Sequence, residues 1–299
     1  VSDGPTTRLL RWYRAAGRDL PWRGPFPRDP YRTLVAEVMA QQTRIDRVVP
    51  AFVGFVRDFP TLEDAASAGV DAVLRAFMGL GYYRRARLLH AALVDVEAAG
   101  EWPRDSAALA ALPGLGAYTS AALAAFCFGA ADPPVDGNVA RIAARVRTLP
   151  HPSGSSELLR AAAAFARGLY AEAPTPEVWE ALMDLGATVC TPAAPACGDC
   201  PLSAACLARI SGRSAALPAK RPRRPAESHA WAAVWIRRSD GRVLLREVSM
   251  GSLLEGLWLP PLAEVRSHEA PLAVGERLAR SLGFGGALKA LPAVRHMIT

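Results

Sequence analysis

Apolar residues recur at helical spacing through the first two hundred positions of the chain. In residues 31–42, for example, apolar side chains stand at positions 34, 35, 38 and 39, which is the pattern of an amphipathic helix. Comparable patterns predict helices over residues 8–20, 31–42, 46–58, 61–76, 83–99, 138–148, 156–171 and 176–189. Alternation with a period of two does not begin before about residue 230, so the first two thirds should be all-helical.

A charge-free segment after residue 106 predicts a hairpin of two helices. Pro113 cannot lie inside the preceding helix, and Gly114 and Gly116 permit backbone angles that other residues avoid. The alanine-rich helix that follows ends before Pro133. Free backbone N–H groups at its start would lie beside the positive end of the helix dipole and suit a phosphate. The same residues could also form an ordinary helix connection.

The last third of the chain has a different pattern. Residues 215–228 form a basic, proline-rich linker. Residues 229–247 alternate on either side of a Ser-Asp-Gly turn and predict a β-hairpin, and residues 271–282 could form a helix. We therefore expect a small α+β domain over residues 229–299, incomplete at its C-terminal end.

Composition narrows the class of protein. The 299 residues, 51% hydrophobic and 21% charged, fit two or three soluble domains. A net charge of +7 makes a polyanionic partner plausible but does not establish one. No apolar signal segment begins the sequence, and Pro113 with its neighbouring glycines interrupts the uncharged stretch 106–131. We expect no membrane span and a cytoplasmic protein, associated with a bacterial nucleoid.

Two acids are candidate catalytic groups. Glu37 lies beside the apolar stripe of residues 31–42, where desolvation would raise the pKa of its carboxyl and make it a proton donor near neutral pH. The alternative, and the commoner case, is an acid at the edge of the stripe that reaches water. Asp136 stands in an Asp-Gly-Asn turn and could instead only cap the next helix.

Aromatic and amide side chains near these acids are candidates for contacts with nucleic acid. Trp22 next to Arg23 offers a flat surface beside a cation, although the tryptophan could simply cover a helix end. Gln42 could contact base edges. Residues 82–85, Tyr-Tyr-Arg-Arg after a Gly-Leu-Gly turn, would suit a wedge against stacked bases; a packed aromatic pair with a solvated basic face is the alternative.

Four cysteines give the sharpest chemical signal. They stand at positions 190, 197, 200 and 206 with the spacing C-x6-C-x2-C-x5-C. Disulfides are disfavoured because nothing suggests export. Zinc usually has two close pairs, whereas here only Cys197 and Cys200 form one. An iron–sulfur cluster accepts such unequal spacings, so Cys190, Cys197, Cys200 and Cys206 favour a cluster over zinc.

These residues together resemble the adenine DNA glycosylase family (MutY type), among the helix-hairpin-helix, endonuclease III-like glycosylases. The likeness covers essentially the whole chain, and as a set its motifs are highly specific. They are LPWR (20–23), EVMAQQTR (37–44), GLGYYRRAR (79–87), LPGLGAYT (112–119), VDGNVAR (135–141), the cysteine loop 190–206 and EGLW (255–258).

The resemblance implies a mainly α fold with two helical lobes and double-stranded DNA in the cleft between them. Residues 29–130 would form a six-helix barrel with the helix-hairpin-helix. Residues 1–28 and 131–214 would form the other lobe, holding a [4Fe-4S] cluster. Residues 229–299 would form a Nudix-like domain after the linker. We expect a monomer.

The implied reaction is the removal of adenine opposite 8-oxoguanine or guanine, from a nucleotide flipped out of the duplex. Glu37 would protonate the adenine, and Asp136 would stabilise the positive charge of the sugar. The resemblance gives further residues three roles. The adenine pocket would be lined by Trp22, Arg23, Tyr118 and Glu180, with Asn138 supporting Asp136. Gln42 and Tyr82 would wedge the duplex. A phosphate, together with a monovalent or divalent cation, could bind the hairpin around Leu112, Gly114, Leu115 and Gly116.

The sequence departs from its wider superfamily at several positions. Bifunctional members have lysine where Tyr118 stands; tyrosine cannot form a Schiff base, so we expect a monofunctional enzyme. Ala40 replaces a larger apolar residue, and we expect only local repacking. No REUxEExGU Nudix box is present, so the last domain should not hydrolyse nucleotides. The family's Phe-Ser-His-like loop, which reads 8-oxoguanine, would fall at residues 297–299, which puts lesion discrimination in doubt.

Three rival interpretations remain open from the sequence. A pyrimidine mismatch or damage glycosylase could share the scaffold. A catalytically silent cluster protein could bind or sense DNA. The four cysteines could hold zinc.

Overall fold

The computed structural model describes residues 3–221, 228–248 and 257–295 of the chain. The chain divides into two compact units, Val1–Pro222 and Arg223–Thr299. The first two residues of the EGLW motif and the segment 297–299 lie outside the described residues. Within the described ranges, no helix combines the length and the apolar character needed to cross a membrane.

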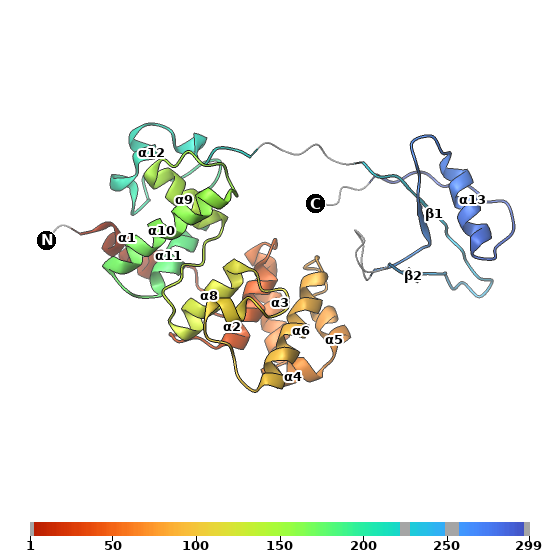
Figure 1. Cartoon of the computed structure of the whole chain (residues 1–299), viewed down its shortest axis with the longest axis horizontal. Helices are drawn as coiled ribbons and strands as arrows, with labels where there is room; N and C mark the ends of the chain where they lie inside the picture. Colours follow the sequence, from red (N-terminus) through yellow and green to blue (C-terminus); the bar gives the residue numbers. More distant parts are fainter. Residues whose placement is uncertain (1–2, 222–227, 249–256, 296–299) are drawn as a thin grey trace. The chain divides into compact units, whose positions relative to one another are not determined.

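The first unit is built from helices (Figure 1). Twelve α-helices lie in its described part, together with two short 3₁₀ helices, η1 (Ser203–Ala205) and η2 (Ser214–Ala216). The α-helices are α1 (Pro5–Ala16), α2 (Pro30–Ala40), α3 (Ile45–Asp58), α4 (Leu62–Ser67), α5 (Val70–Ala76), α6 (Arg84–Ala99), α7 (Ser106–Leu109), α8 (Ala117–Phe128), α9 (Gly137–Arg147), α10 (Ser156–Glu172), α11 (Glu177–Thr188) and α12 (Leu207–Ile210).

The unit has two main hydrophobic cores, and α8 contributes to both. One core joins α2, α3 and α6, and includes Leu123 and Ala124 of α8. The other joins α1, α9 and α11, and includes Ala122 and Phe126 of α8. All nine residues from Thr119 to Cys127 are buried. A helix that is covered on every side can carry no charged face, which explains why the alanine-rich segment is uncharged.

The helical prediction for the first two thirds of the chain is confirmed in outline and wrong in some bounds. The described residues before Trp231 contain no strand, although one isolated bridge joins Pro152 and Ala219. The predicted helix 61–76 is two helices, because Gly69 has a φ of +79° and breaks the hydrogen-bonded ladder. The predicted helix 8–20 ends at Ala16.

The packed part of the first unit continues into the segment expected as a linker. Leu217 is buried, and its carbonyl oxygen accepts a hydrogen bond from Arg145 Nε at 2.9 Å. The backbone N–H of Ser153 donates to the carbonyl oxygen of Ala219 at 2.8 Å. The packed part of the first unit therefore extends at least as far as Ala219, beyond residue 215, where the predicted linker begins.

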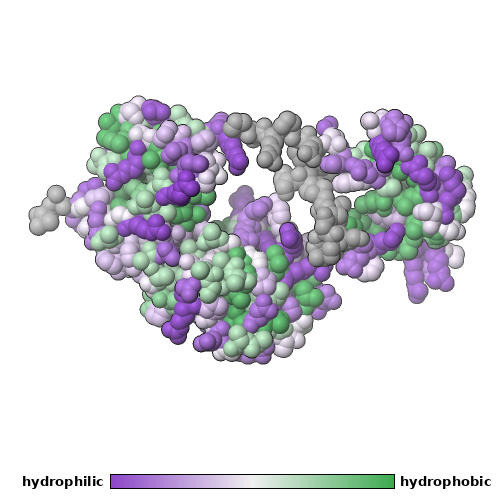
Figure 2. All heavy atoms as spheres, viewed as in Figure 1, coloured by the Kyte–Doolittle hydropathy of each residue, from purple (hydrophilic) through white to green (hydrophobic). Residues whose placement is uncertain are grey.

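The second unit combines strands with one helix. Its described strands are β1 (Trp231–Ala233), β2 (Arg246–Glu247), β3 (Trp258–Leu259) and β4 (Leu262–Glu264), and its helix is α13 (Pro271–Ser281). β1 pairs antiparallel with β4, and β2 with β3. The expected hairpin is present as a bridge between Arg237 and Val243. Both hydrophobic and hydrophilic side chains appear on the face of this unit in Figure 2.

Candidate active site

Glu37 lies in the last turn of α2, next to buried residues of the helix such as Val38. Its helix begins at Pro30 and is capped by Asp29, whose carboxylate accepts from the backbone N–H of Arg32. The Glu37 side chain is partly exposed, but its carboxyl group is desolvated. Burial raises the pKa of Glu37 to about 7. A carboxyl group with this pKa carries a proton about half of the time at neutral pH.

Four neighbours act on this carboxyl group. A hydrogen bond with the Tyr118 hydroxyl, from the first turn of α8, and the positive charge of Arg23 lower its pKa, whereas the charges of Asp136 and Glu180 raise it. Burial also raises the pKa of Tyr118 well above its ordinary value. The phenol therefore stays protonated and remains available as a hydrogen-bond donor. The fold thus brings Glu37, Tyr118 and Asp136 within electrostatic reach of one another.

Asp136 is the N-cap of α9, so the structural alternative raised from the sequence is confirmed for this residue. Its carboxylate accepts from the backbone N–H groups of Asn138 at 2.9 Å and Val139 at 2.8 Å, and from the Asn138 side-chain amide at 2.7 Å. These bonds orient the carboxylate, and the positive end of the helix dipole favours its negative charge. Capping does not compete with a catalytic role, because Asp136 also acts on the pKa of Glu37.

The partner of Asp136 is itself held in place. Arg141 Nη2 donates to Asn138 Oδ1 at 2.7 Å and to the carbonyl oxygen of Gly186 at 2.8 Å. A Cβ atom at Gly186 would lie 2.4 Å from Asn138 Cβ, so only glycine allows α11 to approach α9 this closely at that position. Asn138 is therefore positioned by both helices.

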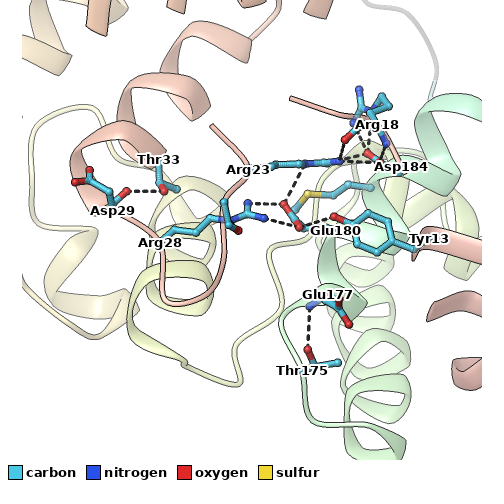
Figure 3. A network of polar contacts seen from close by, with 12 residues as sticks. Tyr13, Arg18, Arg23, Arg28, Asp29, Thr33, Thr175, Glu177, Glu180 and Asp184 are labelled. Atoms are coloured by element: carbon cyan, nitrogen blue, oxygen red, sulfur yellow. Dashed lines mark hydrogen bonds and ion pairs between the residues drawn. The ribbon is translucent and has the colours of Figure 1, made fainter. Parts of the chain in front are cut away.

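A network of buried ion pairs lies on α11 beside these acids (Figure 3). Arg28 donates to both Glu180 carboxylate oxygens, with Nη2 2.7 Å from Oε2. The Tyr13 hydroxyl donates to Oε2 at 2.6 Å. Arg23 lies between the two acids of this helix: its Nε is 3.1 Å from Glu180 Oε1, and its Nη1 is 2.7 Å from Asp184 Oδ2.

Asp184 is the most deeply buried acid of the network, with a relative exposure of 0%. Arg18 donates to it from its backbone N–H and from its guanidinium, at 2.8 Å from Nε to Oδ1. Burial by itself would raise the pKa of Asp184, but the guanidinium groups of Arg23 and Arg18 outweigh burial and hold this pKa below its ordinary value. The network therefore keeps a buried carboxylate ionised.

Both Trp22 and Arg23 have more partners in the structure than the sequence indicates. The Trp22 ring packs edge-on against Phe52 of the α2–α3 core, with the ring centroids 5.2 Å apart. The Arg23 side chain is only 10% exposed and is occupied by Glu180 and Asp184. The Arg23 guanidinium therefore forms one wall of the site, and its ion pairs with Glu180 and Asp184 connect it to α11.

Sequence reasoning missed four members of the network. They are Tyr13, Arg18, Arg28 and Asp184. A usable signal was present for the last of these, because Glu180 and Asp184 stand one helical turn apart among mostly apolar residues of α11. The three others come from the N-terminal thirty residues and are joined to α11 only by tertiary folding.

Gln42 and Tyr82 are exposed residues on two loops next to α2 and α6. The two loops are in contact, because Thr43 Oγ1 donates to the carbonyl oxygen of Leu80 at 3.4 Å. Tyr82 is 45% exposed. Both residues expected to act together on a duplex therefore lie on neighbouring loops of one lobe.

The predicted hairpin is present between α7 and α8. Gly114 has a φ of +76°, and a Cβ atom there would lie 2.6 Å from Leu88 Cβ. The expectation for Gly116 was wrong: its φ of −84° is open to any residue, and it serves as the N-cap of α8. Leu115 is buried in the α2–α3 core. No side chain of the described residues caps α8, so its first N–H groups remain available to an anion.

The four cysteines line one cavity, together with Arg145 of α9 and apolar residues such as Ile142. Arg145 is buried and donates to Cys190 Sγ at 3.3 Å and to the carbonyl oxygen of Thr191 at 2.7 Å. In the described residues, no three His, Cys, Asp or Glu side chains form a group that could hold a metal ion.

Comparison with known proteins gives a consistent assignment. Residues 35–166 match the HhH-GPD superfamily of base excision DNA repair proteins. The chain is 42% identical over 222 residues to the adenine DNA glycosylase of Mycolicibacterium smegmatis, covering 72% of this chain and 73% of that protein. It is 41% identical over 210 residues to the human adenine DNA glycosylase, covering 67% of this chain and 38% of that protein. The chain therefore spans less than half of the human relative.

Solved structures share the helical architecture. A thermostable thymine-DNA glycosylase is similar with a TM-score of 0.59 at 27% identity, covering 69% of this chain and 95% of that one. An endonuclease III–DNA complex is similar in fold, with a TM-score of 0.57 at 20% identity, covering 69% of this chain and 94% of that one. The first unit has an endonuclease III-like fold, and the chain belongs to the adenine DNA glycosylase family within the HhH-GPD superfamily.

Proposed function

We propose that this protein is a monofunctional DNA glycosylase that removes adenine from mispairs with 8-oxoguanine or guanine in duplex DNA, as the first step of base excision repair. One observation carries the proposal: a desolvated acid with a pKa of about 7, Glu37, lies within electrostatic reach of a second carboxylate, Asp136, that three N–H groups orient. Hydrolysis of a glycosidic bond needs one acid that gives a proton and one that faces positive charge.

The two acids divide the reaction between them. Glu37 gives its proton to a ring nitrogen of adenine, so the base can leave with the electrons of the bond between the sugar C1′ and the base nitrogen. The sugar becomes oxocarbenium-like, and the Asp136 carboxylate stabilises that charge. Water then adds to C1′ and its proton is released. The products are free adenine and an abasic site.

Adenine must leave the base stack before Glu37 can reach it, which costs a few kcal/mol. The exposed side chains of Gln42 and Tyr82 would wedge the duplex and fill the gap. Trp22, Arg23, Tyr118 and Glu180 would line the pocket for the flipped base. The buried ion pairs of Arg23 and Glu180 keep this wall rigid before the substrate arrives.

Tyr118 separates this protein from glycosylases that also cut the strand. A strand-cutting enzyme needs an amine nucleophile for a Schiff base, and the phenol of Tyr118 lacks one. Its high pKa and its hydrogen bond to Glu37 suit a positioning role. We therefore expect base release without accompanying strand cleavage.

Two further sites belong to the proposal. The uncapped N-terminus of α8, with Leu112, Gly114, Leu115 and Gly116 before it, would bind a backbone phosphate, with a monovalent or divalent cation nearby. Cys190, Cys197, Cys200 and Cys206 would hold a [4Fe-4S] cluster. The cluster would supply structural cross-linking of residues 190–206, and the buried Arg145 beside Cys190 would compensate negative charge on its thiolate ligands.

The remaining features of the proposal concern the second unit and assembly. Residues 229–299 would belong to a Nudix-like domain that contributes to recognition of the lesion strand, and the protein would act as a monomer on DNA. The described strands and helix α13 are compatible with an α+β domain of this type.

Single-turnover base release tests the proposal directly. Duplexes would carry adenine opposite 8-oxoguanine, thymine opposite guanine, or thymine glycol, with Asp136→Asn as the control variant. Asparagine is an equally good N-cap, so this variant keeps α9 while it removes the charge. We expect release of adenine only, lost in the variant. Release of thymine instead would favour a pyrimidine glycosylase, and duplex binding without any base release would favour a DNA-binding cluster protein.

The metal centre has its own test. A protein purified without oxygen should show broad visible absorbance that is lost on oxidation or reduction, with iron and sulfide in equal amounts. Colourless protein containing one zinc ion would contradict the cluster.

A further inference from the structure

The two loops that would enter the duplex have strained backbones. Gln42 and Tyr82 have φ values of 54° and 49°, in the left-handed region. For residues with a side chain this conformation is unfavourable, and it persists only where the surroundings hold it. Thr148 is the third such residue in the described ranges, and it simply ends α9. The two expected wedge residues therefore need an external support.

Arg85, near the start of α6, contacts both loops. Its guanidinium donates to five backbone carbonyl groups and one hydroxyl. The acceptors around Gln42 are the carbonyl oxygens of Val38 (3.0 Å), Met39 (2.9 Å) and Gln41, and Thr43 Oγ1 (2.7 Å). The acceptors just before Tyr82 are the carbonyl oxygens of Leu80 (3.1 Å) and Gly81 (3.4 Å).

The environment of Arg85 argues for a role beyond stability. The residue is 8% exposed, and its guanidinium lies over the Tyr82 ring, 6.0 Å from the centroid. All six acceptors are neutral, and Nε has no hydrogen-bond partner among the residues that the structure describes. Burying a cation among neutral groups is costly, so a gain in stability is not by itself a reason for an arginine at this position. An apolar residue cannot join two loops, whereas the four N–H groups on Nη1 and Nη2 of Arg85 are shared among six acceptors around both loops.

We propose that Arg85 is a positioning residue that joins the Gln42 and Tyr82 loops into one preformed two-pronged wedge for base extrusion. The inference rests on the proposed function and adds the residue that couples its two loops. Arg85 does not touch the nucleotide. It acts by holding both backbones in the left-handed conformation before DNA binds.

The test compares two substrates, each carrying adenine. In one the adenine is paired opposite 8-oxoguanine; in the other it faces a one-nucleotide gap and needs little unstacking. We expect Arg85→Gln to slow single-turnover release from the paired duplex by roughly 10-fold or more and from the gapped duplex by less than about 3-fold. Arg85→Lys keeps the charge but cannot span both loops, so it should behave like Arg85→Gln.

Two controls separate positioning from a general loss of charge or stability. Arg75→Gln removes the same charge from an exposed position on α5, and it should leave the ratio of the two rates unchanged. In a chain that already carries Gln42→Ala and Tyr82→Ala, adding Arg85→Gln should change this ratio by less than about 2-fold, because coupled residues are not additive.

Several results would overturn the inference. They are equal slowing on both substrates, full recovery of the ratio in Arg85→Lys, or an additive effect in the triple variant. If the unsubstituted chain releases no adenine, the proposed function fails, and fluorescence decides the inference. A 2-aminopurine at the target position should brighten on binding the unsubstituted chain and not on binding Arg85→Gln. The same emission with both proteins would contradict the role of Arg85.

Discussion

Glu37 on α2 and Asp184 on α11 are both desolvated carboxyl groups of the first unit, yet their surroundings move their pKa values in opposite directions. Around Glu37, burial acts together with the negative charges of Asp136 and Glu180, and the pKa rises to about 7. Around Asp184, two guanidinium groups outweigh burial and the pKa falls. Burial therefore does not decide the protonation state by itself; the contacting cations do.

The two carboxyl groups therefore have different roles: Glu37 is the proposed proton donor, and Asp184 holds parts of the fold together. Glu180 and Asp184 use three arginines to hold the N-terminal segment against α11. Glu37 forms no ion pair in the described residues, so it keeps a proton that it can transfer.

The largest effect is expected from neutralising Glu37. Glu37→Gln removes the transferable proton while it keeps the shape of the side chain, and we expect single-turnover adenine release to fall by roughly 10³-fold. Binding of the mismatched duplex should change little. A variant that still releases adenine at a rate within a few fold of the parent would remove Glu37 from the mechanism.

Neutralising Asp184 should damage the fold. Asp184→Asn removes the counter-charge of the partly exposed Arg18 and one of the two counter-charges of the buried Arg23, and breaking a buried pair costs about 3–5 kcal/mol. Denaturant unfolding should report this loss in the free energy of unfolding.

The matched control for Asp184 stands on the same helix. Glu177→Gln breaks an exposed ion pair with Arg14, 2.6 Å long, and should change the free energy of unfolding by less than about 1 kcal/mol. Equal destabilisation by Asp184→Asn and Glu177→Gln would contradict the structural role assigned to the network.

Neutralising Glu37 should stabilise the protein at pH 8, whereas neutralising Asp184 should destabilise it. The folded-state pKa of Glu37, about 7, lies above its ordinary value, so the folded protein binds this proton more tightly than the unfolded chain. Its contribution to stability is present at acidic pH and is lost as pH rises towards 7. At pH 8, Glu37→Gln should therefore be more stable than the parent by about 1–3 kcal/mol. The gain should vanish near pH 4.

The pH dependence of catalysis follows from the same group. Because the protonated form of Glu37 acts, base release should be constant below its pKa and fall about tenfold for each pH unit above it. The residual activity of Glu37→Gln should lack this step. A profile that stays flat between pH 6 and pH 9 in the parent would show that another group supplies the proton.

Local patterns in the sequence predicted the helices well, because about a dozen residues are enough to show the apolar spacing of an amphipathic helix. They failed where one residue changed the path, as Gly69 does between α4 and α5. The hairpin was expected from Pro113 and the glycines, and the structure places its strain at Gly114 alone.

The site was predictable only in part. Glu37 stood out as an acid beside an apolar stripe, and Asp136 as an acid in a turn. The ion pairs of Asp184 join residues more than 160 positions apart, and no local pattern encodes such a contact. Arg85 looked like one of several surface arginines after a tyrosine pair, because its burial depends on how α2 packs against α6.

The most direct test of this account is the pKa of the Glu37 carboxyl itself. Protein labelled with ¹³C at the side-chain carboxyl of glutamate would be titrated by NMR, and the Glu37 resonance assigned by its absence in Glu37→Gln. We predict a midpoint near pH 7 for this resonance, because burial and the neighbouring negative charges raise the pKa of Glu37. A midpoint near the ordinary glutamate value of about 4.3 would contradict the assignment of Glu37 as the proton donor.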